Sequence, residues 1–347
     1  MKKIIALLLA VVMCCCLFAA CGKTEAPAAP AEPAAPADPA APAAPAEPAA
    51  PADVITLRLA DNQADGTPNV MGDQKFAELV KEYTGGAVVV EVINNGVLGD
   101  ELSVADQIQL GTLDVARIGN IAPTCSAYKV TTLPYLFSNF EEMCAAYDGE
   151  FGQALAATLK EETGIINLTY FFSGARSFYT SEKPINGVAD MAGMKIRAQD
   201  DPVTIAMFTA LGANATPIAY AEVYSAIDTK IVDGAENDFV SYYTSGHYEV
   251  APYYSLDMHT MGPSVFIMSE ATWNSLSAEH QDAVMKAAAD ASQYQRTVVA
   301  EKNAEARAAV EAAGCTIIEV DVAEFQAACA TVYDEYPELQ QYIDLLK

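Results

Sequence analysis

The sequence contains few of the side chains from which most catalytic sites are built. Its 347 residues include three histidines, His247, His259 and His280. It has no Gly-x-Ser-x-Gly, His-Glu-x-x-His, phosphate-binding glycine loop or Gly-x-Gly-x-x-Gly. Because histidine is the commonest acid–base group and metal ligand, triad and metal-dependent chemistry have few candidates here. A secreted enzyme is therefore the weaker hypothesis, and we expect no catalytic residues, no metal and no cofactor.

Basic residues are also scarce. The chain has 19 Lys and Arg against 46 Asp and Glu, which gives a formal net charge of −27. Such an acidic chain is a poor partner for nucleic acid or for an anionic membrane surface. An anionic small molecule is still compatible with it, because charges beyond about 10 Å are largely screened in physiological salt. A single arginine in a binding site would then determine whether an anion binds.

Closely spaced cysteine pairs of the metal-binding kind are absent from the part of the sequence after Cys21. The four cysteines there are Cys125, Cys144, Cys315 and Cys329. Outside the cytoplasm they would form up to two disulfides, with three possible pairings. Buried free thiols are equally compatible with the sequence, so the disulfide state stays open.

The N-terminus has the pattern of an export signal. Lys2 and Lys3 precede an apolar run that ends in small residues, Ala19 and Ala20, immediately before Cys21. This resembles a bacterial lipobox, although Phe18 stands where an aliphatic residue is usual. We expect residues 1–20 to be a lipoprotein signal peptide and Cys21 to be acylated. An ordinary signal peptide or an uncleaved anchor helix is the alternative.

A proline-rich segment follows the expected lipidation site. Proline occurs at every third position from Pro27 to Pro51, the period of a polyproline II helix. Such a segment has nothing to bury, and at about 3.1 Å per residue it would reach roughly 90 Å. We expect residues 21–53 to be the lipidated cysteine and its tether, extended or disordered.

Strand and helix patterns alternate from Asp53 onward. The periodicity predicts strands at 55–60, 88–93 and 115–118, and helices at 69–84 and 101–110. This order is typical of an α/β fold with mainly parallel sheets. The chain after the tether has more residues than a single hydrophobic core usually accommodates, so two lobes are expected.

One segment is too long for a single lobe. Residues 277–313 contain neither proline nor glycine, carry apolar residues at helical spacing and stop at Gly314, with Ser277 as a suitable N-cap. A helix of this length would extend about 55 Å at 1.5 Å per residue. It either breaks or runs across both lobes.

Arg197 is the leading candidate for binding an anion. Residues 194–199 read as a strand, and Asp201 followed by Pro202 is a typical helix start. Arg197 would thus lie near the carboxyl end of a strand in an α/β sheet, where ligands bind. Its guanidinium matches a carboxylate with two parallel hydrogen bonds. The alternative is a surface arginine paired with Asp200.

Four segments together resemble the DctP-like substrate-binding proteins of TRAP transporters. They are 193–197 (Gly-Met-Lys-Ile-Arg), 210–217, 222–229 and 232–237 (Val-Asp-Gly-Ala-Glu-Asn), and they occur in the family's order. Residues 95–101, 109–114, 258–260 and 272–273 match as well, and the resemblance covers Ile55 to Lys347. Ala215 replaces the family's usual proline in a turn.

The resemblance implies a two-lobed periplasmic-binding-protein-like fold with a long helix spanning both lobes. It also implies roles for individual residues. Arg197 falls on the arginine that clamps the ligand carboxylate, Arg176 on a second cleft arginine, Asn237 on the amide that reaches the same carboxylate, and Tyr220 on an aromatic pocket residue. The expected lobes are 54–173 plus 262–302 and 174–261 plus 303–347.

Further candidates are less specific. Asn62 and Gln63 follow the first strand and Asn120 follows the third, where they would bind ligand hydroxyls or serve as turn residues. His259 lies in a Tyr253–Thr260 segment that looks like the sugar-acid branch of the family, with a structural role as the alternative. Glu222 and Glu236 would hold helices and arginines in place.

We therefore expect an extracytoplasmic, lipid-anchored or periplasmic monomer that delivers a small carboxylate to TRAP permease subunits. A sugar acid such as a uronate or aldonate is favoured over a C4-dicarboxylate, in which Arg176 would take the second carboxylate. A binding protein for an ATP-driven importer or a receptor feeding a sensor are further alternatives. The sequence leaves open which acid is bound and which ion drives the transporter.

Overall fold

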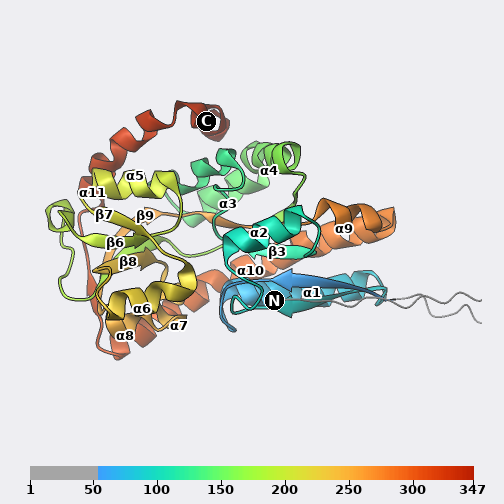
Figure 1. Cartoon of the computed structure of the whole chain (residues 1–347), viewed down its shortest axis with the longest axis horizontal. Helices are drawn as coiled ribbons and strands as arrows, with labels where there is room; N and C mark the ends of the chain where they lie inside the picture. The colour runs from blue at the N-terminus through green and yellow to red at the C-terminus, as the bar shows by residue number, and fades with distance from the viewer. Residues whose placement is uncertain (1–53) are drawn as a thin grey trace, which may run out of the picture. The chain divides into compact units, whose positions relative to one another are not determined.

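Two mixed β-sheets covered by helices make up the structure, a computed structural model that describes residues 54–347 (Figure 1). The predictions on the signal peptide, on Cys21 and on the tether concern residues 1–53 and lie outside the described residues. Five of the nine strand pairings are parallel. The expected α/β class with two lobes is confirmed, and antiparallel strands are more frequent than the sequence suggested.

The first sheet contains the three strands predicted near the start of the domain. Its order is β2 (Val88–Ile93), β1 (Ile55–Ala60), β3 (Val115–Ile118), β10 (Pro263–Met268) and β4 (Ile166–Phe172). The first three strands pair in parallel, whereas β10 runs antiparallel to both of its neighbours. The helices associated with this half are α1 (Pro68–Tyr83), α2 (Glu101–Gln109), α3 (Phe140–Asp148), α4 (Glu150–Thr163) and α9 (Glu270–Ser275).

The second sheet contains the strand that carries Arg197. Its order is β11 (Thr316–Ile318), β9 (Tyr253–Thr260), β5 (Arg176–Thr180), β8 (Gly234–Asn237), β6 (Lys195–Ala198) and β7 (Asn214–Pro217). Its helices are α5 (Pro202–Ala210), α6 (Val223–Asp228), α7 (Phe239–Thr244), α8 (His247–Val250) and α11 (Val322–Cys329). As expected, Asp201 caps α5 by accepting a hydrogen bond from the backbone of Thr204 at 2.9 Å.

Helix α10 (Ala278–Ala312) is unbroken and contacts both halves of the structure. Ser277 caps its start, and its N-terminal half packs into the apolar core behind the first sheet through Val284, Ala288 and Ala291. Near its other end, Val310 belongs to the core of the second sheet. The predicted long helix spanning both lobes is confirmed.

The chain also crosses between the sheets at residues 173–175, which link β4 to β5, and at 261–262, which link β9 to β10. The C-terminal segment follows α11 and returns to the first half. There, the Tyr342 hydroxyl on α12 (Gln340–Ile343) lies 2.9 Å from the Thr158 hydroxyl on α4. Short 3₁₀ helices complete the described chain: η1 (Ser126–Thr132), η2 (Val188–Met191), η3 (Tyr220–Glu222), η4 (Ala330–Glu335), η5 (Pro337–Leu339) and η6 (Asp344–Leu346).

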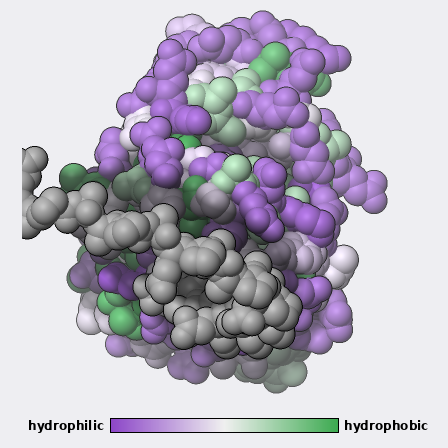
Figure 2. Space-filling view, turned by 90° about the vertical axis from the view of Figure 1, so that its right-hand side faces the viewer, coloured by the Kyte–Doolittle hydropathy of each residue, from purple (hydrophilic) through white to green (hydrophobic). Residues whose placement is uncertain are grey.

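The structure shows the character of the surface and the state of the cysteines. Hydrophilic residues dominate the part of one face that Figure 2 leaves uncovered, as the acidic sequence implies. Cys125, Cys144, Cys315 and Cys329 are free thiols, so the described residues contain no disulfide. Between residues 54 and 347, no helix combines the length and the apolar character needed to cross a membrane.

Candidate ligand-binding site

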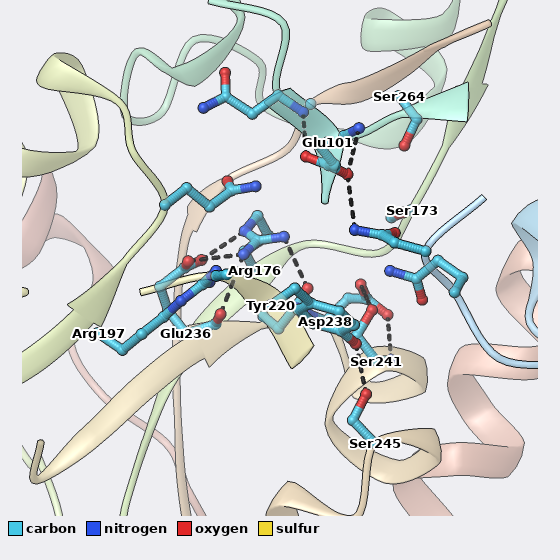
Figure 3. A pocket seen from close by; sticks show the side chains of 18 of the residues that line it. Glu101, Ser173, Arg176, Arg197, Tyr220, Glu236, Asp238, Ser241, Ser245 and Ser264 are labelled. Atoms are coloured by element: carbon cyan, nitrogen blue, oxygen red, sulfur yellow. Dashed lines mark hydrogen bonds and ion pairs between the residues drawn. The ribbon is translucent and has the colours of Figure 1, made fainter. Parts of the chain in front are cut away.

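A cavity of about 760 Å³ is lined by residues from both halves of the structure. The first half contributes Asn62, Gln63 and Asn120, which follow β1 and β3. The second half contributes Arg176, Arg197, Tyr220, Asn237 and His259. All eight residues predicted to bind ligand thus line one cavity, and Figure 3 shows several of them from close by. Their hydrogen bonds show which polar groups are still available to a ligand.

Arg197 presents an unpaired guanidinium to this cavity. The side chain is 4% exposed, and its Nε donates to the carbonyl oxygen of Ile218 at 2.8 Å. Among residues 54–347, no carboxylate lies within salt-bridge distance of it. Burial lowers the pKa of Arg197, and the more distant Glu236 opposes this shift. The alternative pairing with Asp200 does not occur, so both terminal nitrogens are available to an anion.

Arg176, in contrast, is held by acceptors of the protein. Its Nε and Nη2 donate to the two carboxylate oxygens of Glu236 at 2.5 and 2.7 Å. Nη2 also donates to the Glu236 carbonyl oxygen at 3.1 Å, and Nη1 donates to Oδ1 of Asn237 at 2.7 Å (Figure 3). Four of its five N–H groups are therefore used. Burial works against the charge, but Glu236 raises the pKa of Arg176.

The charge of Arg176 is part of a buried chain of ionised groups. His259 lies behind Glu236, with Nε2 at 3.4 Å from Glu236 Oε2 and Nδ1 at 2.7 Å from Asp257 Oδ2. Burial alone would lower the pKa of His259, but Asp257 and Glu236 raise it to about 9. Burial alone would raise the pKa of Glu236, but Arg176 and His259 lower it to about 2. Imidazolium, carboxylate and guanidinium therefore coexist at neutral pH.

Two roles were considered for His259, contact with the ligand and structural support of its neighbours, and the contacts of its ring bear on both. Both ring nitrogens have carboxylate partners, the residue is fully buried, and its ring lies 4.5 Å from that of Phe178. It supports Arg176 through Glu236, as the structural alternative stated. Direct contact of His259 with a ligand stays a prediction.

Asn237 and Tyr220 flank the two arginines. Oδ1 of Asn237 accepts from Arg176 and from the backbone of Asp238, which leaves its Nδ2 without a partner in the described part of the chain. The hydroxyl of Tyr220 lies 2.6 Å from that of Ser245, so its half-buried ring is held at the cavity wall. Asn237 thus offers an amide donor, and Tyr220 offers mainly an aromatic surface.

The first half contributes an ion cluster that the sequence analysis did not identify. Arg117 on β3 is 3% exposed and pairs with Asp61 and with Glu101, and it also donates to Oδ1 of Asn62. Glu101 in turn accepts from the backbone of Gly119 at 2.8 Å. The sequence feature that could have indicated this cluster is an arginine within an otherwise apolar strand. A charged side chain that is buried in such a strand requires a partner.

The three polar residues predicted in this half differ in whether their side-chain amides still have groups without a hydrogen-bond partner. Both groups of the Asn62 amide are engaged, by Arg117 and by Glu101. Asn120 forms a turn with Ala122 and donates from Nδ2 to the carbonyl oxygen of Asp200 at 3.4 Å, a direct link between the two lobes. The amide of Gln63 has no partner among residues 54–347 and is the freest of the three.

Further cavity-lining residues were missed from the sequence, including His247, Ser241, Ser245 and Thr204. They come from helices α5, α7 and α8 and the turns beside them, where no strand-end rule points to the cavity. Within residues 54–347, no three His, Cys, Asp or Glu side chains are arranged to hold a metal ion. The cavity is suited to bind a small acid through hydrogen bonds.

Comparisons with known proteins identify relatives that bind solutes. A solute-binding protein of Chromohalobacter salexigens is 38% identical over 80% of this chain and 84% of its own length. Among solved structures, a TRAP periplasmic solute-binding protein of Roseobacter denitrificans with bound β-D-glucuronate has 40% identity and a TM-score of 0.80. That match covers 84% of this chain and 98% of the other. One from Sulfitobacter sp. with bound β-D-galacturonate has 37% identity and a TM-score of 0.81, with 84% and 99% covered.

The family match covers most of the described residues. The DctP family, described as bacterial extracellular solute-binding protein, family 7, matches residues 59–339. This span includes both sheets apart from the first four residues of β1, and it includes every residue predicted to bind ligand. The chain belongs to the DctP family of bacterial extracellular solute-binding proteins, and its relatives serve TRAP transporters.

Proposed function

We propose that this protein binds a uronate in the cavity between its lobes and delivers it to a TRAP permease. The observation that carries the proposal is which of the three cavity arginines have carboxylate partners. Arg117 and Arg176 have buried carboxylate partners, whereas Arg197 has none within the described residues 54–347. A buried guanidinium without a counter-ion favours a ligand that brings one carboxylate.

The same observation argues against a C4-dicarboxylate. A second carboxylate would require Arg176, but one N–H of that guanidinium remains for it. Taking Arg176 from Glu236 would leave a buried carboxylate with His259 as its remaining partner, at considerable cost. The bound glucuronate and galacturonate of the two solved relatives also carry one carboxylate each, with hydroxyls that suit the free amides of Gln63 and Asn237.

The remaining predictions fit this function. We propose lobes at 54–173 plus 262–302 and at 174–261 plus 303–347, which close over the ligand about α10 and the two crossovers. Closure would expel water and strengthen the contacts of Arg197. We further propose that Cys21 carries the lipid anchor and that the protein works as a monomer.

A thermal unfolding screen tests the proposed ligand class. The purified protein would be heated with D-glucuronate, D-galacturonate, succinate, or glucose as the uncharged control. Ligand at 100 times its dissociation constant adds about 2.7 kcal/mol to the stability of the folded state. Either uronate should raise the melting temperature clearly more than succinate or glucose does. If succinate alone stabilises the protein, the uronate proposal is wrong and the ligand is a dicarboxylate.

A further inference from the structure

His247 is a buried histidine at the cavity wall that the account so far does not use. It is the first residue of α8 and follows Gly246, whose φ of +69° makes the turn into the helix. The side chain is 1% exposed, yet it lines the cavity near Arg197 and Tyr220. The Tyr220 ring meets the imidazole edge-on, with centroids 5.9 Å apart.

A hydrogen bond to Tyr179 determines which nitrogen of His247 carries the proton. Nδ1 of His247 lies 2.7 Å from the Tyr179 hydroxyl. Burial raises the pKa of Tyr179 well above its usual value, so the phenol keeps its proton. Because Nδ1 of His247 is its one hydrogen-bond partner among residues 54–347, we assign the Tyr179 O–H as the donor and Nδ1 as the acceptor.

The imidazole is also neutral. Burial, followed by the positive charge of Arg197, lowers the pKa of His247 to about 4. A neutral imidazole that accepts a hydrogen bond at Nδ1 must carry its hydrogen on Nε2. Nε2 has no partner in the described part of the chain. His247 therefore carries an N–H donor without a partner among residues 54–347, on a side chain that lines the same cavity as Arg197.

We infer that His247 is a ligand-binding residue whose Nε2–H donates to an oxygen of the acid held by Arg197, and that Tyr179 is a positioning residue that fixes the tautomer. The inference rests on the proposed function for the identity of the acid. A neutral donor adds a hydrogen bond without adding a second charge. It therefore increases affinity for the acid without requiring a second carboxylate on the ligand.

Two substitutions separate hydrogen bonding from packing. In H247Q the amide nitrogen can occupy the position of Nε2, whereas in H247N the shorter side chain reaches only the position of Nδ1. Calorimetry with D-glucuronate should show H247N about 10- to 100-fold weaker than wild type, the effect expected for a hydrogen bond to a charged group. H247Q should recover most of that loss. Binding by H247N within twofold of wild type would overturn the inference.

Nitrogen-15 NMR of the wild-type protein keeps the test independent of folding defects. With three histidines in the chain, the His247 signals can be assigned by their absence from H247Q. We expect a neutral Nε2–H tautomer from pH 8 down to pH 5, and a shifted Nε2 signal when D-glucuronate is added. Protonation of His247 at pH 6, or an Nδ1–H tautomer, would overturn the inference even if no uronate binds. Failure of wild type to bind either uronate would instead refute the proposed function.

Discussion

Replacing Glu236 with glutamine removes the carboxylate shared by Arg176 and His259 while keeping its shape. Glu236 is 2% exposed and accepts from Arg176 at 2.5 and 2.7 Å. Loss of one partner from a buried ion pair costs about 3–5 kcal/mol, because the remaining charge stays buried. Against a typical total stability of about 5–15 kcal/mol, E236Q should unfold at a much lower urea concentration.

The pH dependence of stability identifies the groups involved. The pKa of His259 is raised from 6.5 to about 9 in the folded protein, which corresponds to about 3 kcal/mol. This contribution is complete below pH 6.5 and is lost as the pH rises through 9. That loss should be smaller in E236Q, because His259 keeps Asp257 alone. The pKa of Glu236, about 2, predicts a second loss as the pH falls from 4.5 through 2, which E236Q should lack.

An exposed ion pair provides the matched control. Glu305 pairs with Lys302 at 2.8 Å on the surface of α10. E305Q should change the free energy of unfolding by about 1 kcal/mol or less. Urea titrations of wild type, E236Q and E305Q between pH 2 and pH 9.5 would measure the loss of stability in E236Q and both pH dependences. If E236Q is no less stable than E305Q, the buried ion chain does not exist as described.

Three further predictions follow from the site, the anchor and the hinge. Arg176→Lys should weaken D-glucuronate binding less than Arg197→Lys does, because Arg176 is occupied by Glu236; equal losses in calorimetry would argue for direct carboxylate contact by both. Cys21→Ser should release the protein from membranes after cell lysis, and unchanged partitioning would refute acylation. Small-angle scattering with saturating D-glucuronate should show a smaller radius of gyration, whereas an unchanged radius would argue against lobe closure.

Much of the fold could be predicted because its signals are local. Strands β1, β2 and β3 have the predicted bounds, since each is a short segment rich in Val, Ile and Leu between turn residues. Helix α10 begins one residue after its predicted cap and ends two residues before Gly314. The antiparallel strand β10 was not predicted, because pairing between residues more than a hundred positions apart leaves no local pattern.

The site was predicted less completely than the fold. Strand-end position and family motifs indicated all eight predicted residues, and these do line one cavity. Which of their groups are free depends on partners distant in sequence. The sequence assigned Arg197 and Arg176 different roles, but it does not show that Arg176 is paired. That pairing depends on Glu236, which is 60 positions away from Arg176. No sequence feature indicated His247 as a binding residue, because its proposed role depends on which ring nitrogen carries the proton, and the hydrogen bond to Tyr179 sets that tautomer.

Calorimetry of D-glucuronate binding to wild type and to Arg197→Lys tests the central claim, that one unpaired arginine holds the ligand carboxylate. Lysine keeps the charge but loses the planar fork of donors. Disruption of a buried charged pair typically costs about 2–5 kcal/mol, or roughly 30- to several-thousand-fold in the dissociation constant. We predict a loss in that range for folded R197K. Binding by R197K within threefold of wild type would contradict the account.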